Sequence, residues 1–176
     1  MQPKKYAGIG SRNTPNEILK VMKRLGTHYA NNKYLLRSGN CQGADQAFQH
    51  GVNIVEPHLI ELFLPNKNYN KKKQVKGNRI VYDQKHFKEA LVIASQIHLR
   101  WSNLSKMGKI FHGRSVQMIL GYDLQTPSDF VICWTHEAKE VGGTAIGIIL
   151  AKEKNIPVLN LANKEHLNEC LRTINV

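Results

Sequence analysis

Residues 6–12 read YAGIGSR, an apolar run of strand character that turns on two glycines. A helix start follows at once, because Thr14 suits the N-cap, Pro15 the first helical position and Glu17 the position three residues after the cap. A strand that passes through a glycine turn into a helix is the first half of a βα unit. This stretch therefore predicts an α/β protein built on a parallel sheet.

The same order of elements recurs along the chain. A second strand is expected at residues 34–38 (YLLRS), followed by a helix from Gly43, and a third strand at residues 60–65 (IELFLP). Residues 129–135 (DFVICWT) and 156–161 (IPVLNL) are also strand-like. Right-handed crossovers between parallel strands put helices on the faces of the sheet. We predict a Rossmann-like parallel sheet with helices on both faces.

Residues 129–135 are the most apolar of these runs, and a helix from residue 145 to about 154 separates them from the last strand. A strand that is buried on both faces reads as a nearly continuous apolar run, so residues 129–135 are expected inside the sheet. The side chains of Phe130, Ile132 and Val158 are predicted to be almost fully buried.

The chain has 176 residues and a formal net charge of +12 at pH 7. The charge is concentrated in residues 61–115, which hold twelve Lys and Arg against three Asp and Glu. Residues 66–83 are polar, with Lys71–Lys73 at their centre. We predict a single domain over residues 1–176, with a basic loop and a helical insertion at about 66–105. The positive electrostatic field of such a basic region attracts phosphate groups, although a solubilising lysine surface has the same composition.

Three cysteines, Cys41, Cys133 and Cys170, lie far apart and without CxxC spacing. Their odd number favours free thiols and a reducing compartment. No apolar stretch approaches the roughly 20 residues that cross a bilayer, there is no signal-peptide core, and the histidines lack metal-ligand spacing. We expect a cytoplasmic protein with no membrane partner, no bound metal and no cofactor.

Three strand-to-helix junctions are rich in glycine: Gly8 with Gly10, Gly39 with Gly43, and Gly142 with Gly143. In a parallel sheet these junctions share the carboxyl edge, where open α/β sheets bind ligands. Glycine lets backbone N–H groups approach a phosphate, and a helix N-terminus adds positive potential. The spacing fits neither the dinucleotide fingerprint nor the GxxxxGK[ST] phosphate loop. The junctions predict a cleft for a nucleotide or a nucleotide-derived ligand.

The predicted ligand-binding residues belong to these junctions or to the helix before the most apolar strand. They are Gly8, Gly10, Ser11, Arg12, Ser38, Gly39, Gly43, Asp45, Arg114, Met118, Gly142, Gly143 and Thr144. Phosphate is expected at Gly142–Thr144, with Arg12 and Arg114 as cationic partners. Ribose or base is expected near Ser38 and Asp45. A purely structural role for Asp45, in the first turn of a helix, is an equal alternative.

At these junctions the sequence resembles the SLOG superfamily of Rossmann-like proteins, which includes the Lonely Guy phosphoribohydrolases and the DNA-processing protein A family. Residues 38–45 (SGNCQGAD) are similar to the Ser-Gly-x-x-x-Gly-x-Asp stretch of the DNA-processing family. Arg114 with Met118 is similar to the Arg-and-Met helix of the Lonely Guy enzymes, and residues 142–144 (GGT) to part of their phosphate loop. The resemblance covers most of the chain and is nearest to a compact subgroup common in phage and bacterial genomes. It implies a Rossmann-like fold, a nucleotide-derived ligand and a homodimer or higher homo-oligomer.

The sequence departs from the Lonely Guy pattern at the catalytic position. Those enzymes carry a glutamate shortly after the threonine, which acts on the N-glycosidic bond, whereas residues 145–148 are AIGI here. Ser115 also stands where relatives often have Asn. Loss of a placed acid or base costs hydrolysis a factor of about 10²–10⁴. The resemblance therefore implies binding more clearly than turnover.

Three functions stay open from the sequence. The first is a binding module that senses or sequesters a nucleotide-derived signalling ligand. The second is an N-glycosidase or phosphoribohydrolase that acts on nucleotides, with Asp45 or Glu140 replacing the missing glutamate. The third is single-stranded nucleic acid binding like that of the DNA-processing family, with stacking by Tyr69, Tyr82 and Trp101.

Overall fold

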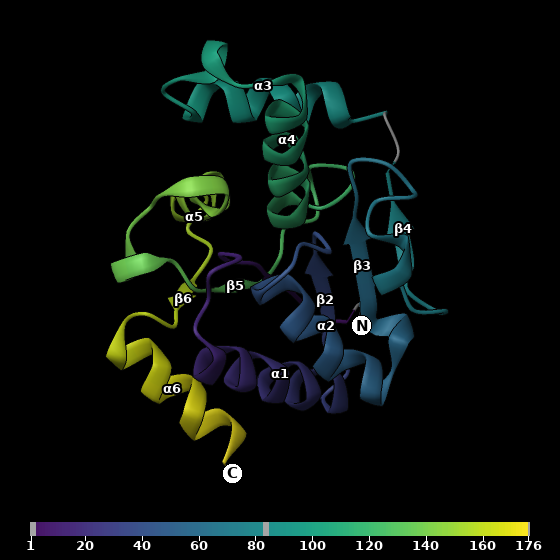
Figure 1. Cartoon of the computed structure of the whole chain (residues 1–176), viewed down its shortest axis with the longest axis vertical. Coiled ribbons are helices and arrows are strands. Elements are labelled where there is room, and N and C mark those ends of the chain that lie inside the picture. Colours follow the sequence, from purple (N-terminus) through teal and green to yellow (C-terminus); the bar gives the residue numbers. More distant parts are fainter. Residues whose placement is uncertain (1–2, 83–84, 176) are drawn as a thin grey trace.

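The computed structural model describes residues 3–82 and 85–175. Six strands form one sheet in the order β4-β3-β2-β1-β5-β6, and all neighbours pair in parallel (Figure 1). The strands are β1 Lys5–Gly8, β2 Leu35–Ser38, β3 Ile60–Phe63, β4 Arg79–Val81, β5 Phe130–Cys133 and β6 Val158–Asn160. The α-helices are α1 Asn16–Asn31, α2 Ala44–Val55, α3 Phe87–Ile97, α4 Lys106–Leu120, α5 Ala145–Glu153 and α6 Lys164–Ile174. The predicted Rossmann-like parallel sheet is confirmed.

The strand order contains one reversal. From β1 the chain builds outward through β2 and β3 to β4, and then it returns to place β5 on the other side of β1. Tyr6 of β1 is in register with Leu36 on one side and Phe130 on the other. The connections after β1 and after β5 therefore leave the sheet in different directions, which opens a crevice at the carboxyl edge.

Helices cover both faces of the sheet because neighbouring residues of a strand point to opposite faces. Tyr6 belongs to the core shared with α1, α2 and α6, whereas Ala7 belongs to the core shared with α3, α4 and α5. In β5, Ile132 faces the first core, and Val131 and Cys133 face the second. The two groups of helices lie on opposite sides of the sheet in Figure 1. In the described part of the chain, no helix combines the length and the apolar character needed to span a membrane.

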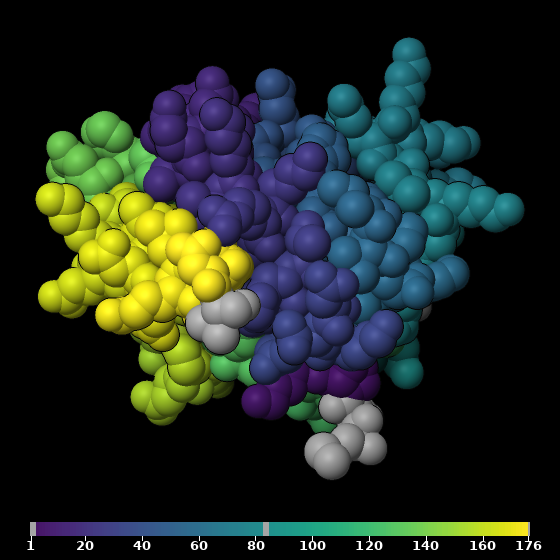
Figure 2. All heavy atoms as spheres, turned by 90° about the horizontal axis from the view of Figure 1, so that it is seen from below, coloured from purple at the N-terminus to yellow at the C-terminus, as the bar shows by residue number. Residues whose placement is uncertain are grey.

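The helices of the first layer pack very closely. A Cβ atom added to Gly26 of α1 would lie 2.4 Å from the Phe48 carbonyl oxygen, and one added to Gly51 of α2 would lie 2.0 Å from the Lys23 carbonyl oxygen. These two glycines therefore allow the backbones of α1 and α2 to touch. Figure 2 shows the outer face of this layer, with the yellow α6 beside the dark purple α1.

The basic loop expected at residues 66–83 is partly wrong. A short 3₁₀ helix at Lys71–Lys73 and the strand β4 lie within it, and Asp83 lies outside the described residues. A strand of three residues at the edge of a sheet is too short to show a period of two. Its position is fixed by pairing with β3, where Glu61 is in register with Arg79.

Burial at the amino edge of the sheet differs from the prediction. Ile132 is fully buried as expected, but Phe130 and Val158 are only partly buried. Phe130 is the first residue of β5 and stacks on Tyr6, with ring centroids 5.6 Å apart. Val158 opens β6, which is an edge strand and has a neighbour on one side only. The ends of short strands therefore keep some exposure even in an apolar run.

The start of the first helix also differs from the prediction. Helix α1 begins at Asn16 with Pro15 in the N-cap position, and no side chain caps it. The Thr14 hydroxyl instead donates to the carbonyl oxygen of Ser11, at 2.7 Å. Thr14 therefore fixes the turn after β1 and not the helix.

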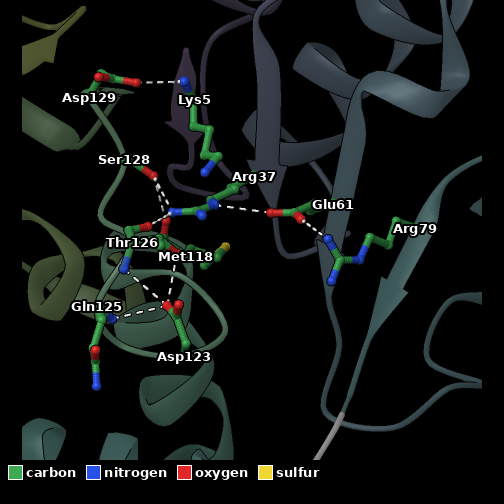
Figure 3. Close-up of polar contacts among 10 residues, drawn as sticks. All are labelled: Lys5, Arg37, Glu61, Arg79, Met118, Asp123, Gln125, Thr126, Ser128 and Asp129. Atoms are coloured by element: carbon green, nitrogen blue, oxygen red, sulfur yellow. Dashed lines mark hydrogen bonds and ion pairs between the residues drawn. The ribbon is translucent and has the colours of Figure 1, made fainter. Parts of the chain in front are cut away.

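A charged row crosses the strands β2, β3 and β4 on one side of the sheet (Figure 3). Glu61 lies between Arg37, whose Nε is 3.1 Å from its Oε2, and Arg79, whose Nη1 is 2.7 Å from its Oε1. The Arg37 Nη1 also donates to the Thr126 carbonyl oxygen at 2.7 Å and to Ser128 Oγ at 3.3 Å. Arg37 therefore ties the connection between α4 and β5 to the sheet, and all its contacts are structural.

Candidate functional site

A cavity of about 570 Å³ opens at the carboxyl edge of the sheet, beside the reversal of strand order. Four segments line it: residues 9–13 after β1, Cys41 and Asp45 after β2, one face of α4, and Thr135 with residues 141–144 after β5. Ligand sites of open α/β sheets are found at this position. We call this cavity the cleft.

Nine of the thirteen predicted residues line the cleft. They are Gly10, Ser11, Arg12, Asp45, Arg114, Met118, Gly142, Gly143 and Thr144. The other four, Gly8, Ser38, Gly39 and Gly43, lie behind this lining. Ser38 is fully buried, where its Oγ donates to the Gly8 carbonyl oxygen at 3.3 Å and accepts from Gln49 Nε2 at 2.9 Å.

Glycine is required behind the lining because other groups come very close. A Cβ atom at Gly39 would lie 2.9 Å from both the Arg114 guanidinium carbon and Asp45 Oδ2. Gly43 has a φ of +89°, and a Cβ atom there would lie 2.8 Å from the Ser11 carbonyl oxygen. These two glycines allow the turns after β1 and β2 to pack together.

The turn after β1 presents Arg12 at the mouth of the cleft. The Ser11 N–H donates to the Trp134 carbonyl oxygen at 3.1 Å, which extends the pairing of β1 with β5 beyond the strands. The Asn13 N–H donates to Ser11 Oγ, also at 3.1 Å. With the backbone fixed in this way, the exposed Arg12 side chain is free to reach an anion in the cleft.

Asp45 is a buried carboxylate in the wall of the cleft, with 4% of its surface exposed. Its Oδ2 accepts hydrogen bonds from the N–H groups of Gly39 and Cys41, each at 3.1 Å. Burial raises the pKa of Asp45 to about 6, although the positive charge of Arg114 and the two N–H donors oppose the rise. Asp45 therefore shapes the turn after β2, and it can exchange a proton near neutral pH.

Arg114 is equally buried, with 4% exposed, and it connects α4 to the turn after β2. Its Nη1 donates to the Gly39 carbonyl oxygen at 2.6 Å, and its Nη2 donates to Cys41 Sγ at 3.1 Å. The guanidinium carbon lies 4.8 Å from the ring centroid of Phe111 and 5.5 Å from that of Tyr69. The Nε is buried and has no hydrogen-bond partner among the described residues. The cation is held in place but keeps unused hydrogen-bonding capacity beside the cleft.

Residues Gly142–Thr144 form a 3₁₀ turn that runs directly into α5. Gly142 has a φ of +68°, and a Cβ atom added to it or to Gly143 would have no heavy atom within 4 Å. The first N–H groups of a helix have no partner within the helix. This turn therefore offers open backbone donors and the positive end of a helix dipole to the cleft.

Several lining residues were missed by the sequence reasoning, among them Ile9, Cys41, Phe111 and Thr135. Phe111 had a signal, since it lies three residues before Arg114 on the same face of a helix. Thr135 had no signal in the sequence. Its hydroxyl is positioned by a long-range contact, because it accepts a hydrogen bond from Asn160 Nδ2 of β6 at 2.7 Å.

Four residues proposed for catalysis or stacking lie outside the lining of the cleft, and of these Tyr69 lies behind it against Arg114. Glu140 is exposed and forms an ion pair with Lys152. Tyr82 is 46% exposed on the segment after β4, and Trp101 lies beside His112 on the α3–α4 connection. Within residues 3–82 and 85–175, no three His, Cys, Asp or Glu side chains form a group suited to a metal ion.

Comparison with known proteins identifies a similar fold. No protein-family model matches the chain, and no curated protein matches it. Among solved structures, DNA processing protein A from Helicobacter pylori is similar, with a TM-score of 0.59 over 97% of this chain and 72% of that one.

The chain shares the fold of DNA processing protein A. The identity is 17%, so the likeness concerns the fold alone. The H. pylori protein is described as having a unique single-stranded DNA binding mode. It belongs to one of the two families on which the sequence resemblance rested.

Proposed function

We propose that the cleft binds a nucleotide or a nucleotide-derived ligand, as a module that senses or sequesters it. The observation that carries the proposal is the convergence of Arg12, Arg114 and Gly142–Thr144 on one cavity of about 570 Å³. Small-molecule sites commonly have volumes of about 300–1,000 Å³ and combine apolar walls with a few polar groups. Ile9 and Met118 supply apolar wall here.

The charge distribution supports one orientation of the ligand. The phosphate lies toward Gly142–Thr144, where open N–H groups and the start of α5 favour an anion. Arg12 closes over the phosphate from the mouth, and Arg114 adds positive potential from the wall. The sugar or base lies toward Asp45 and Met118, because a carboxylate accepts hydrogen bonds from hydroxyl or amino groups.

Native mass spectrometry of the purified protein, before and after denaturation, tests the proposal. We expect a copurified nucleotide, or saturable binding of one member of a nucleotide panel by isothermal titration. Arg12→Ala should weaken binding by about 1–2 kcal/mol, the scale of a charged hydrogen bond that is partly exposed. Lys106→Ala, at the exposed start of α4, is the matched control and should bind like the wild type. Equal affinities of Arg12→Ala and the wild type for the nucleotide would mean that Arg12 does not contact its phosphate.

Single-stranded nucleic acid binding is a second candidate. It is supported by the fold shared with DNA processing protein A and by the basic segment at residues 66–82, which borders the cleft. In that segment Asn70 Nδ2 donates to the Asn40 carbonyl oxygen at 2.8 Å, and Tyr69 faces Arg114. Oligonucleotide affinity that falls steeply with salt, together with no mononucleotide binding, would favour this candidate.

Turnover of the ligand is a third candidate, and it depends on Asp45. A buried carboxyl with a pKa of about 6 in a cleft suits general acid or base chemistry on an N-glycosidic bond. Glu140 is the weaker choice, because it pairs with Lys152 outside the lining. Incubation with nucleoside monophosphates and an assay for free base tests this. Release of base that survives Glu140→Gln and stops in Asp45→Asn would support it.

A homodimer or higher homo-oligomer is proposed from the surface of α3 and α4. Val92 of α3 is 55% exposed, Met107 of α4 is 47% exposed, and Leu99 in the connection between them is fully exposed. Exposed large apolar side chains in one region are typical of a protein interface. Light scattering at micromolar concentration should give a multiple of 20.0 kDa. A monomer mass would contradict this.

A further inference from the structure

The three cysteines occupy very different environments. Cys133 and Cys170 are 0% and 1% exposed within the two hydrophobic cores. Burial raises the pKa of Cys133 to about 12 and that of Cys170 to about 11, so neither forms a thiolate at neutral pH. Cys41 is partly exposed and lines the cleft. Of the three, only Cys41 meets both solvent and a cavity.

Polar groups surround the Cys41 side chain. Arg114 Nη2 donates to its Sγ at 3.1 Å, the Tyr69 hydroxyl lies 3.6 Å from Sγ, and the Cys41 N–H donates to Asp45 Oδ2. The Arg114 Nε beside it is buried without a partner among the described residues, although Arg114 lines the cleft. This unsatisfied donor belongs to a side chain in the wall of the cleft. The sulfur therefore lies next to a fixed cation that already has capacity for a negatively charged group.

We propose that Cys41 is a modification site for small anionic thiol-reactive molecules, above all anionic low-molecular-weight disulfides. The Cys41 thiolate attacks one sulfur of the disulfide. A bond forms between Cys41 Sγ and that sulfur, the original S–S bond breaks, and the other half leaves as a thiolate that takes up a proton. Cys41 is oxidised, the departing sulfur is reduced, and no other reactant is needed.

The adduct occupies the cleft. It displaces Arg114 Nη2 from Cys41 Sγ and puts the anionic group of the reagent near Arg12 and Arg114. Modification therefore competes with any other anionic ligand of the cleft. This consequence rests on the proposed nucleotide binding, whereas the reactivity of Cys41 does not.

Alkylation rates of the native full chain test the reactivity. The rate ratio of anionic iodoacetate to neutral iodoacetamide is measured at Cys41 by mass spectrometry of peptides, in the native protein and in urea. Arg12 and Arg114 together with the Asp45 carboxylate leave one net positive charge in the lining. One positive charge at about 4 Å should raise the native ratio about fivefold over the unfolded one at low salt, and added salt should lower it. Cys133 and Cys170 should stay unmodified in the native protein. An equal ratio in both states, or modification of the buried cysteines at the rate of Cys41, overturns the proposal.

Variants assign the effect to the cleft. Arg114→Gln should lower the ratio most, and Arg12→Gln, at an exposed position, should lower it without loss of folding. Cys41→Ser should abolish mixed-disulfide formation with glutathione disulfide, which should react faster than the cationic disulfide cystamine. Cys170→Ala is the matched control and should leave the reaction unchanged. A preference for cystamine contradicts the proposal.

Protection by nucleotide separates the two proposals. If iodoacetate modifies Cys41 selectively and a bound nucleotide slows it, both hold. If modification is selective but no nucleotide protects, the proposed ligand is wrong and the modification site stands. If a nucleotide binds and the anionic preference is absent, the modification site is wrong and the proposed function stands.

Discussion

Arg37 and Arg114 are both buried arginines, with 2% and 4% of their surface exposed, yet their surroundings differ. Arg37 pairs with Glu61 and donates to the 126–128 segment, so its charge is neutralised inside the fold. Arg114 has a carbonyl, a thiol and two aromatic rings, and its Nε has no partner among the described residues. Arg37 therefore has a carboxylate partner inside the fold, whereas Arg114 keeps one donor without a partner among the described residues.

The energetic reason is the cost of burying a charge. Burial lowers the pKa of Arg37, and the charge of Glu61 opposes this change. Arg114 forms no such ion pair among the described residues, and its charge acts on the neighbouring Asp45 carboxyl and on two aromatic faces, which stabilise a cation by about 0.5–2 kcal/mol each. The charge of Arg114 is therefore less fully paired at the wall of the cleft, whereas the charge of Arg37 is paired with Glu61. The comparison predicts that Arg37 matters for stability and Arg114 for binding.

The largest expected effect is on stability. Arg37→Ala leaves Glu61 buried with Arg79 as its remaining cation, and it should lower the free energy of unfolding by about 3–5 kcal/mol. Arg79→Ala is the matched control, because the Arg79 side chain is 66% exposed. It should cost less than about 1 kcal/mol. Urea denaturation followed by circular dichroism measures both, and similar losses would mean that Arg37 is no more structural than a surface residue.

The second expected effect is on binding. Arg114→Ala should weaken the affinity for the copurified nucleotide by about 1.5–3 kcal/mol, the scale of a charged hydrogen bond. Because Arg114 also joins α4 to the turn after β2, a denaturation curve of the same variant must show that it is folded at the titration temperature. Lys106→Ala should bind like the wild type. If folded Arg114→Ala also does so, the contrast between the two arginines fails.

The sequence was sufficient for what depends on local pattern. Five strands, the parallel sheet and the edge that holds the cleft follow from apolar runs and glycine turns. It was insufficient where long-range pairing decides: β4 needs β3 and Glu61, and Phe130 owes its partial exposure to its place at a strand end. The same is true of the cleft. Arg114 was found from its place on the helix before the most apolar strand and from resemblance to a family motif, whereas its aromatic neighbour Tyr69 comes from a segment that showed no period.

The third expected effect is a pH dependence from Asp45. Its pKa is raised from 3.8 to about 6, so between these values the folded state holds a proton that the unfolded state has lost. The contribution of Asp45 to stability is therefore greatest at acid pH, and it falls by about 1 kcal/mol for each pH unit up to about 6. Asp45→Asn keeps a side-chain oxygen as acceptor but has no such proton.

The measurement is the difference in unfolding free energy between wild type and Asp45→Asn at pH values from 4 to 7. This difference removes the contributions that the other carboxyl groups make to both proteins. It should change in favour of the variant as pH rises and become constant above the pKa of Asp45, about 6. A flat difference over the whole range would mean that Asp45 titrates like an exposed carboxyl group.

The smallest expected effect concerns Lys71–Lys73, which carry charge near the cleft without lining it. Replacing all three with Gln should lower mononucleotide affinity by about 0.5 kcal/mol at low salt. It should have no effect at high salt, because the Debye length shrinks from about 30 Å at 0.01 M to about 3 Å at 1 M.

The salt dependence of oligonucleotide affinity tests whether these lysines contact phosphates. If these lysines contact phosphates, the slope of log affinity against log salt falls by about 0.7 for each lost contact on a single strand. A slope reduced by about 2 would mean that Lys71–Lys73 contact the phosphates of a single strand. The strand would then run from these lysines to Arg114 in the cleft. An unchanged slope and unchanged nucleotide affinity would make Lys71–Lys73 a solubilising surface and restrict function to the cleft.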